Sequence, residues 1–195
     1  AESLGSFYKG KHTGTFGKCA ILSFNGNKTV TTGGGGMIIT DDEELAKHSR
    51  HLSTTAKIPH PYEFYHDEVG YNLRMTNVNA AIGVAQMECI NNILENKRKT
   101  ANQYKQFCLE NNIQFLDEPE NSKSNFWLNS ILLKDKLERD TFLKFTNENG
   151  VMTRPIWTLM NKLPMFQNCQ ADELKNSLNL EERIVSLPSG YRFNG

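Results

Sequence analysis

The sequence predicts an α/β chain, and three patterns along it support that prediction. Residues 18–40 read as two strands that are joined through an Asn-Gly-Asn turn, a lysine and four glycines. Residues 76–112 carry apolar side chains at intervals of three and four, which is the spacing of one helix face. From residue 126 to residue 178, strand-like and helix-like segments alternate, which is typical of a small α+β domain.

A helix is expected to follow the paired strands. Thr40 or Asp41 can cap its start, because a side-chain oxygen there accepts amide hydrogens that the helix leaves free. Acidic residues in its first turn and basic residues near its end suit the helix dipole. Residues 53–69, with two prolines and clustered aromatic side chains, are then expected to form an irregular functional loop.

Thr76 can cap the long helical segment that follows this loop. One helix from Thr76 to Asn112 would exceed the usual length in globular proteins, so a bend or break is expected near residues 91–96. The apolar stripe of this segment consists of Val78, Ile82, Ala85, Cys89 and Ile93. Shorter elements are expected beyond it, with strands at 126–133 and 151–155 and helices at 139–149 and 171–178.

Composition excludes several classes of function. The 195-residue chain carries 22 basic and 22 acidic residues, so it offers no basic field for nucleic acid. No apolar run approaches the roughly 18 residues that cross a membrane. The four cysteines are widely scattered, without the spacing of a metal site or the density of a disulfide framework. Reduced thiols and a cytoplasmic location are therefore expected.

Lys28 is the candidate catalytic residue. It follows the turn Asn25-Gly26-Asn27 and precedes a strand-like run at residues 29–32 and the glycines at 33–36. A lysine held between buried strands would be partly withdrawn from water, and burial favours the neutral amine that condenses with a carbonyl. On position alone, a solvated surface lysine remains the alternative. The glycines precede a strand rather than a helix, so they lack the context of a phosphate-binding loop.

Six motifs occur in one order between Gly5 and Tyr191. They are Tyr8-x-Gly10-x-x-x-Gly14, Ser23-Phe24-x-x-x-Lys28 with its glycines, Gly70-Tyr71-Asn72-x-Arg74, Ala85-Gln86-Met87-Glu88, Gly150-Val151-Met152-Thr153-Arg154 and Ser186-Leu187-Pro188. Together they resemble the DegT/DnrJ/EryC1/StrS family of pyridoxal phosphate (PLP) sugar aminotransferases. One motif of this kind would be weak, whereas six in register indicate membership of the family.

The resemblance implies the α/β fold of the PLP-dependent transferases of fold type I, which is the fold of aspartate aminotransferase. Residues 1–93 would form the C-terminal part of the large PLP-binding domain, with the lysine hairpin and the start of the long helix. Residues 94–195 would form the small α+β C-terminal domain. Because the family places roughly half its length before the first of these motifs, the chain is expected to be the C-terminal half of such an enzyme.

The resemblance also implies which residues bind the cofactor. Lys28 would hold PLP as a Schiff base, and Ser23 would contact the cofactor phosphate. Asn72 would reach the phosphate of the neighbouring subunit's PLP, so that a homodimer shares its active sites. A local hydrogen bond to the backbone is the alternative for Ser23, and a polar helix entrance is the alternative for Asn72.

Three further residues are candidates for substrate binding. Arg74 could neutralise phosphate, carboxylate or diphosphate, because its planar guanidinium matches those groups. His60 and Tyr62 would line the mouth of the substrate site. Four histidines fall between residues 48 and 66, but no pair has the spacing of a zinc motif, so surface histidines rather than a metal site are expected.

Two departures from the family pattern bear on the substrate. Gly34 stands where the family usually has a glutamate, and the interval from Asn25 to Asn27 lacks a histidine that many members carry. These changes affect substrate contacts rather than the Schiff base. They also resemble the subgroup that aminates nucleotide-linked 4-keto-6-deoxy-hexosamines in pathways to legionaminic acid and related nonulosonic acids.

The function that the resemblance implies is transamination of a nucleotide-linked 4-keto-6-deoxy sugar to an amino-sugar. PLP is the expected cofactor, glutamate the expected amino donor, and bacterial surface polysaccharide or nonulosonic acid biosynthesis the expected setting. One alternative is a sugar dehydratase of the same family, in which a histidine typically replaces the lysine, and Lys28 argues against it. A non-catalytic half-chain that serves in assembly is the alternative from another class.

Overall fold

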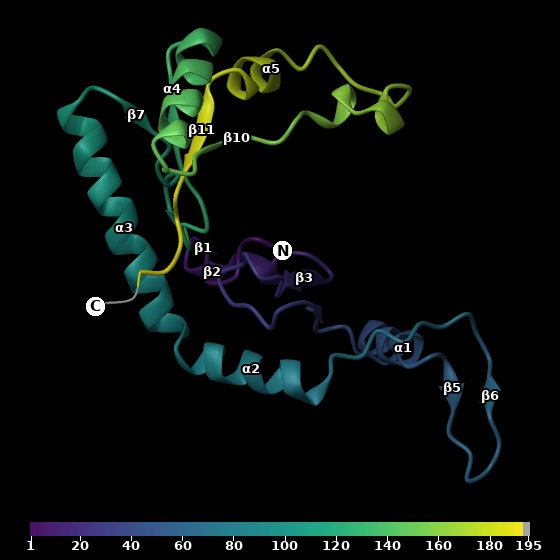
Figure 1. Cartoon of the computed structure of the whole chain (residues 1–195). Helices are drawn as coiled ribbons and strands as arrows, with labels where there is room; N and C mark the ends of the chain where they lie inside the picture. Colours follow the sequence, from purple (N-terminus) through teal and green to yellow (C-terminus); the bar gives the residue numbers. More distant parts are fainter. Residues whose placement is uncertain (193–195) are drawn as a thin grey trace. The chain divides into compact units, whose positions relative to one another are not determined.

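The computed structural model describes residues 1–192 and divides into two compact units (Figure 1). The first unit contains Ala1–Leu94 and Pro119–Asn125, and the second contains Glu95–Glu118 and the chain from Phe126 onward. The expected domain division after residue 93 remains a prediction. Among residues 1–192, no helix combines the length and the apolar character needed to cross a membrane.

The first unit is built from three small antiparallel sheets and two helices that lead into a third. Its elements are β1 (Phe7–Tyr8), β2 (Lys11–His12), β3 (Ala20–Ser23), β4 (Gly36–Ile39), α1 (Glu43–Ser53), β5 (Lys57–Ile58), β6 (Tyr65–His66), α2 (Asn77–Glu88), the start of α3 (Ile90–Glu110) and β8 (Ser122–Lys123). β1 pairs with both β2 and β8, β3 pairs with β4, and β5 pairs with β6. A short 3-10 turn at Thr13–Thr15 follows β2.

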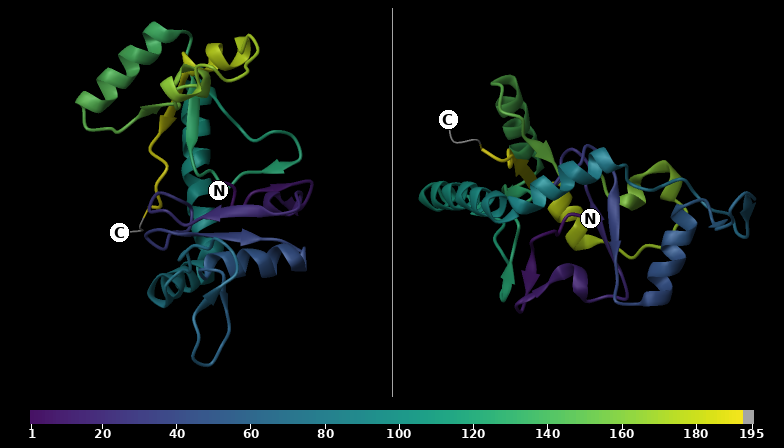
Figure 2. Two further views of the ribbon diagram at one scale, coloured as in Figure 1. Left: turned by 90° about the vertical axis from the view of Figure 1, so that its right-hand side faces the viewer. Right: turned by 90° about the horizontal axis from the view of Figure 1, so that it is seen from below.

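The two strands of the β3–β4 hairpin run side by side (Figure 2), and residues in and next to β3 form the core of the first unit. Its register places Ser23 opposite Gly36. Leu22 and Phe24 are buried together with Val30, which belongs to the long connection between the two strands. The expected strand at residues 29–32 is therefore wrong. The amide of Thr32 donates to the Phe24 carbonyl, which folds this run back over the end of β3 instead of extending it.

The helices of the first unit begin close to the predicted positions. Asp42 caps α1, because its Oδ1 accepts from the Leu45 amide at 2.9 Å, so the cap lies one or two residues later than expected. Thr76 caps α2 as predicted, with its hydroxyl accepting from the Asn79 amide. The long helical segment breaks at Cys89, between α2 and α3, a little earlier than the interval that was expected.

The second unit contains a four-stranded antiparallel sheet in the order β10-β11-β9-β7. Its elements are most of α3, β7 (Gln114–Phe115), β9 (Asn129–Leu132), α4 (Lys136–Glu148), β10 (Arg154–Pro155), two 3-10 turns (Met160–Lys162 and Pro164–Phe166), α5 (Lys175–Glu181) and β11 (Ile184–Leu187). β11 lies between β10 and β9, and its Val185 faces Ile131. The core of this unit consists of Cys108, Ile131, Leu133 and Val185.

A buried lysine anchors the end of the second unit to α3. Lys97 is buried, and its ammonium donates to the Ser189 carbonyl at 2.6 Å. Burial lowers the pKa of Lys97, because it disfavours the charged form. Tyr104, two turns further along the same helix, donates to the Pro188 carbonyl at 3.0 Å. The Ser-Leu-Pro motif is thus held by hydrogen bonds from α3.

We expect Ile131→Ala to lower the free energy of unfolding of the second unit by about 2–5 kcal/mol, because it removes a fully buried side chain from the centre of the sheet. Ile131 is 2% exposed and packs in the core with Val185. Leu109→Ala, on the same unit, removes a side chain that is largely exposed and serves as the control. Urea unfolding of both variants measures the difference, and equal losses would contradict this location of the core.

Candidate active site

Lys28 lies in the connection between β3 and β4. Its amide donates to the Asn25 carbonyl at 3.0 Å, which closes the turn that the Asn-Gly-Asn sequence predicts. Its side chain is 13% exposed, and its Nζ is hydrogen-bonded to the Glu2 carboxylate. Thr29 and Val30, the two residues that follow, are buried. The lysine is therefore largely withdrawn from water and has a carboxylate partner.

Glu2 is a residue of this site that sequence reasoning did not identify. It stands 26 positions before Lys28, and nothing in the sequence pattern connects the two. The hydrogen bond from Lys28 holds the pKa of the Glu2 carboxyl below its ordinary value. Half of the Glu2 side chain is exposed, so the carboxylate stands at the edge of the site. It can orient the amine and balance its charge.

Asn125 fixes the backbone that carries Glu2. Its side-chain amide is buried and donates to the carbonyls of Glu2 and Leu4, at 2.7 and 2.9 Å. Its backbone amide donates to the hydroxyl of Ser6 at 3.0 Å. Buried amides are stabilised when their donors are satisfied in this way. Asn125 is thus a positioning residue for the carboxylate that contacts Lys28.

Helix α2 holds the other end of the lysine connection, through Asn79 near its start and Gln86 near its end. The side-chain amide of Asn79 donates to the Thr32 carbonyl at 2.5 Å, and the side chain of Gln86 accepts from the Thr31 amide at 3.3 Å. The Thr31 hydroxyl donates in turn to the Phe24 carbonyl. The connection is therefore tied both to its own hairpin and to α2. This arrangement explains why two distant motifs, around Lys28 and around residues 79–86, belong to one site.

Ser23 is the last residue of β3, five positions before Lys28, and it is partly buried. Its backbone pairs with Gly36 at the end of the hairpin where the connection that carries Lys28 begins. A Cβ at Gly36 would lie 2.7 Å from the Leu22 carbonyl oxygen, so only glycine allows the strands to approach this closely. The final glycine of the run therefore has a structural reason. Ser23 and Lys28 stand on one hairpin.

Asn72 and Arg74 lie on a second segment, which is held against the end of α1. The Tyr71 amide donates to the Leu52 carbonyl, and the Thr55 amide donates to the Tyr71 carbonyl. Thr54 and Asn72 form an isolated antiparallel bridge. Both predicted site residues are exposed. The backbone that carries Asn72 and Arg74 is bonded to the end of α1, and the two side chains are accessible for a contact outside the unit.

Gly70 permits this close approach of the two segments. A Cβ at Gly70 would lie 2.3 Å from the backbone carbon of Thr55 and 2.4 Å from the amide nitrogen of Ala56. Contacts of that length do not occur with backbone atoms, so no other residue fits without displacing the chain. The glycine of the Gly-Tyr-Asn motif is thus required by packing two residues before Asn72.

His60 and Tyr62 lie on the hairpin connection between β5 and β6, which the sequence analysis expected to be an irregular loop. Their rings meet edge to face, with centroids 4.7 Å apart. His60 accepts from the amide of Glu63 at 2.9 Å, which shapes the turn. Tyr62 is 81% exposed. The predicted site residues therefore come from three segments of the first unit: the lysine hairpin, the segment after Gly70 and the β5–β6 connection.

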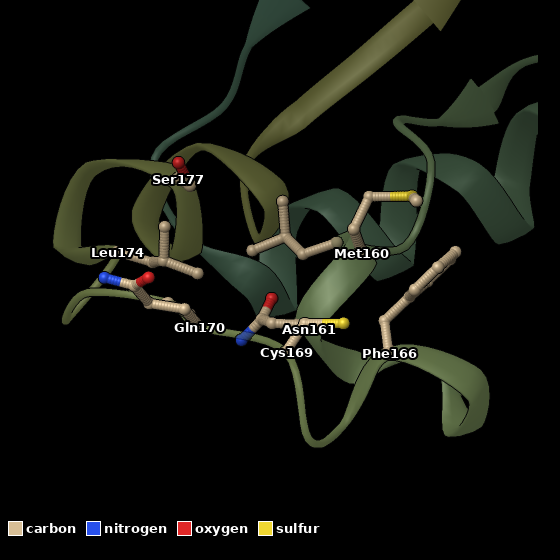
Figure 3. A pocket seen from close by; sticks show the side chains of 9 residues that line it. Met160, Asn161, Phe166, Cys169, Gln170, Leu174 and Ser177 are labelled. Atoms are coloured by element: carbon tan, nitrogen blue, oxygen red, sulfur yellow. The ribbon is translucent and has the colours of Figure 1, made fainter.

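The second unit has a cavity of its own, which sequence reasoning did not identify (Figure 3). Its volume is about 330 Å³, and it lies between the 3-10 turns and α5. Met160, Phe166, Cys169 and Leu174 are among the nine residues that line it. The side-chain oxygen of Asn161 is buried there without a hydrogen-bond partner. None of the predicted site residues lines this cavity.

Comparison with known proteins gives a consistent result along the whole chain. Residues 1–195 match the sequence model of the DegT/DnrJ/EryC1/StrS aminotransferase family. The chain is 38% identical over 190 residues to the GDP-perosamine synthase of Escherichia coli O157:H7, covering 97% of this chain and 51% of that protein. It is 35% identical over 194 residues to the GDP-perosamine synthase of Vibrio cholerae, covering 97% of this chain and 52% of that protein. The chain thus spans about half the length of these relatives.

A solved structure shows the same fold. The aminotransferase PseC of Helicobacter pylori, which is involved in the biosynthesis of pseudoaminic acid, superposes with a TM-score of 0.92 at 22% sequence identity. The superposition covers all of this chain and 54% of PseC. The predicted α/β fold of the type I PLP-dependent transferases is confirmed by this likeness.

Proposed function

The chain belongs to the DegT/DnrJ/EryC1/StrS aminotransferase family. From this premise we propose that it forms part of a PLP-dependent aminotransferase that acts on nucleotide-linked keto-sugars. The observation that carries this proposal is the setting of Lys28, whose side chain is largely withdrawn from water and whose amine contacts a carboxylate. Withdrawal from water favours the neutral amine that condenses with a carbonyl, and the Glu2 carboxylate can accept the proton that the ammonium must first lose. The two GDP-perosamine synthases support a sugar-nucleotide substrate.

The residues of the lysine hairpin fit the proposed cofactor. Lys28 supplies the amine for its aldehyde, and the hydroxyl of Ser23 supplies one donor for its phosphate. A phosphate dianion is usually held by several charge-assisted hydrogen bonds, so Ser23 provides a share of that site rather than the whole of it. When bound, PLP supplies the electron sink that makes the α-proton of an amino acid removable.

The chain's own part in the reaction is positioning and proton transfer. With PLP and an amino donor bound, the amine of Lys28 would take the proton from the donor's α-carbon and return it to the C4′ carbon of the cofactor. Glu2 orients that amine through their hydrogen bond. The same steps in reverse place an amino group on the keto-sugar. Lys28 would thus both hold the cofactor and transfer the proton, so the proposed reaction depends on this one side chain.

Finer features of the proposal concern the substrate and the pathway. We propose a 4-keto-6-deoxy sugar as the acceptor, glutamate as the donor and nonulosonic acid biosynthesis of the legionaminic type as the setting. The sequence around Lys28, with Gly34 in place of the usual glutamate, supports this subgroup. Arg74, His60 and Tyr62 are the proposed contacts to the substrate, since all three are exposed around the segments described above.

A panel of UDP-, GDP- and dTDP-linked keto-sugars tests this function. The whole protein is incubated with PLP, glutamate and each sugar, and the products are identified by mass spectrometry. The expected result is an amino-sugar together with an equal amount of 2-oxoglutarate. A dehydrated sugar, or no turnover of any member of the panel by protein that binds PLP, would contradict the proposal.

The proposed assembly is a homodimer whose active sites are shared between subunits. Asn72 is exposed on a rigid backbone, which suits a contact to a neighbouring chain. The adjacent helix α2 contains no buried residue, and several of its apolar side chains are exposed. Val78 is 73% exposed, and Ile82 and Met87 are also exposed. An exposed apolar surface of this kind marks an interaction site. A two-fold axis would bring the same surface of both subunits together.

Two inactive variants are expected to restore each other in this dimer. If Asn72 serves the neighbouring site, a mixed dimer of Lys28→Ala and Asn72→Ala has one site with both substitutions and one site with neither. Each mixed dimer then has one intact site of two, and random exchange of equal amounts makes about half of the dimers mixed, so up to about a quarter of the wild-type activity should return on mixing. The assay is amino-sugar formation after subunit exchange, with exchange followed independently by mass spectrometry of differently labelled chains. Complete exchange without recovery would place Asn72 in the active site of its own chain.

A further inference from the structure

We propose that the first unit contains a binding site for a divalent transition metal ion of the zinc type. Its four ligands come from two segments, α1 and the residues directly after β6. They are His48, His51, Asp67 and Glu68. This site is separate from the lysine hairpin, and it does not depend on the proposed transamination.

The side chains of the two segments already face each other. His48 Nε2 lies 3.0 and 3.2 Å from the two carboxylate oxygens of Glu68. His51 Nε2 lies 2.6 Å from Oδ1 of Asp67. The two histidines stand three positions apart on α1 and therefore lie on one helix face. Ligand atoms of His51, Asp67 and Glu68 all lie within 4.8 Å of one another.

These separations are close to what a tetrahedral ion requires. Zinc holds imidazole nitrogen and carboxylate oxygen at about 2.0–2.2 Å, which places neighbouring ligand atoms about 3.3 Å apart. The pair of His48 and Glu68 is within a few tenths of an ångström of that spacing. The ligand atoms of His51, Asp67 and Glu68 lie within 4.8 Å of one another, so they need to close by about 1.5 Å at most, while the 2.6 Å pair of His51 and Asp67 needs to open slightly. His48 joins these three through its contact with Glu68. Rotation of the side chains can supply this, because His48, Asp67 and Glu68 are more than one third exposed and His51 is 25% exposed.

The charge of the cluster also suits a divalent cation. Neutral imidazoles and ionised carboxylates give the four ligands a charge of about −2, which one divalent ion balances. Lys47 directly precedes His48 in the sequence, yet its ammonium pairs with Glu43 and Glu44. Two nitrogen and two oxygen ligands match the preferences of zinc better than those of magnesium or calcium, which prefer oxygen alone.

An ion at this position would fasten α1 to the segment that leads to Asn72. The acidic pair stands just before Gly70, and the backbone beyond it is bonded to the end of α1 through Tyr71 and Leu52. The metal would add a second link between the same two segments. Its role would be structural, since it would restrict the backbone of the segment that carries Asn72.

Metal titration of the 195-residue chain tests the site. The chain is stripped with a chelator, its fold is monitored by far-ultraviolet circular dichroism, and it is titrated with Zn²⁺ in a calorimeter. The expected result is saturation at about one ion per chain, as for a structural site. Co²⁺ should bind in its place and give the strong visible absorption of a tetrahedral nitrogen and oxygen site. Zn²⁺ should also raise the thermal unfolding temperature of the chain.

Matched variants locate the binding. His48→Gln and Glu68→Gln each remove one ligand and are expected to weaken Zn²⁺ binding about tenfold or more, since even the partners of metal ligands cost 10–100-fold. His60→Gln and Glu44→Gln remove the same groups nearby, outside the cluster, and should bind as the parent chain does. Both cluster positions are exposed, so these variants should keep the fold. The absence of saturable binding, or equal affinity in cluster and control variants, would overturn the proposal and leave two histidine–carboxylate pairs.

Discussion

Lys28→Ala is expected to lower the rate of amino-sugar formation by the whole protein by about 10²–10⁴-fold or more, the range that positioned acid–base groups contribute. The variant loses the amine that we propose condenses with the cofactor aldehyde and moves the proton. Removal of the side chain also leaves the Glu2 carboxylate without its hydrogen bond. We expect turnover to be lost even where PLP is retained noncovalently, so the rate and the cofactor content are measured separately.

Lys18→Ala is the matched control for this experiment. Lys18 lies just before β3, is 75% exposed on its side chain and pairs with Asp42 on the surface. Exposed ion pairs of this kind contribute little to stability. The control should therefore retain the parent rate. If Lys28→Ala kept a rate within about tenfold of the parent, equivalent to about 1.4 kcal/mol of barrier, Lys28 would not be the catalytic residue.

Gly70→Ala is expected to destabilise the first unit and to displace Asn72. The added methyl would lie 2.3 Å from the backbone of Thr55, so the two segments must separate. Overpacking of this kind costs about 1–3 kcal/mol. The hydrogen bonds of the Tyr71 and Leu73 amides to α1 are lost in addition, at about 0.5–1.5 kcal/mol each. Thermal unfolding and amide hydrogen exchange at Thr55, Tyr71 and Leu73 measure the effect.

The control for this substitution is Gly190→Ala. A methyl at Gly190 meets no atom within 4 Å, and its backbone conformation is open to other residues. It should leave the unfolding temperature nearly unchanged. If Gly70→Ala were as stable as this control, with unchanged exchange at the three amides, the close approach of the segment to α1 would be wrong.

The sequence predicted the elements that depend on local chemistry. The Asn-Gly-Asn turn, the Thr76 cap and the apolar period of the long helix depend on residues that are near one another in the chain. Each was found within a few residues of its expected place. The family resemblance then supplied the fold class, which local patterns alone do not specify.

The errors arose where distant contacts override local preference. Residues 29–32 have the composition of a strand, but their polar groups bond to Phe24, Asn79 and Gln86 instead of to a neighbouring strand. β11 was not predicted at all, although it lies between β9 and β10 in the sheet. Its four residues are too few to show a period, and only the pairing with β9 makes them a strand.

The candidate site was predictable in part for the same reason. Lys28, Ser23 and Asn72 are marked by motifs, whereas Glu2 and Asn125 act on Lys28 across 26 and 97 positions of sequence, which no spacing rule connects. The cluster around His51 was missed because its carboxylates lie on another segment, 16 or more positions away. Zinc motifs in a sequence are recognised by the spacing of their histidines, and carboxylates that lie directly after β6 do not belong to such a pattern.

The return of Pro119–Asn125 to the first unit has a consequence for dividing the chain into fragments. The path crosses between the units three times, after residues 94, 118 and 125. A fragment that ended at Leu94 would lack β8, the outer partner of β1, and would lack the Asn125 amide that holds the Glu2 carbonyl. Chimeras between relatives should therefore exchange Pro119–Asn125 together with residues 1–94, because a single crossover point would combine a hairpin from one parent with its support from the other.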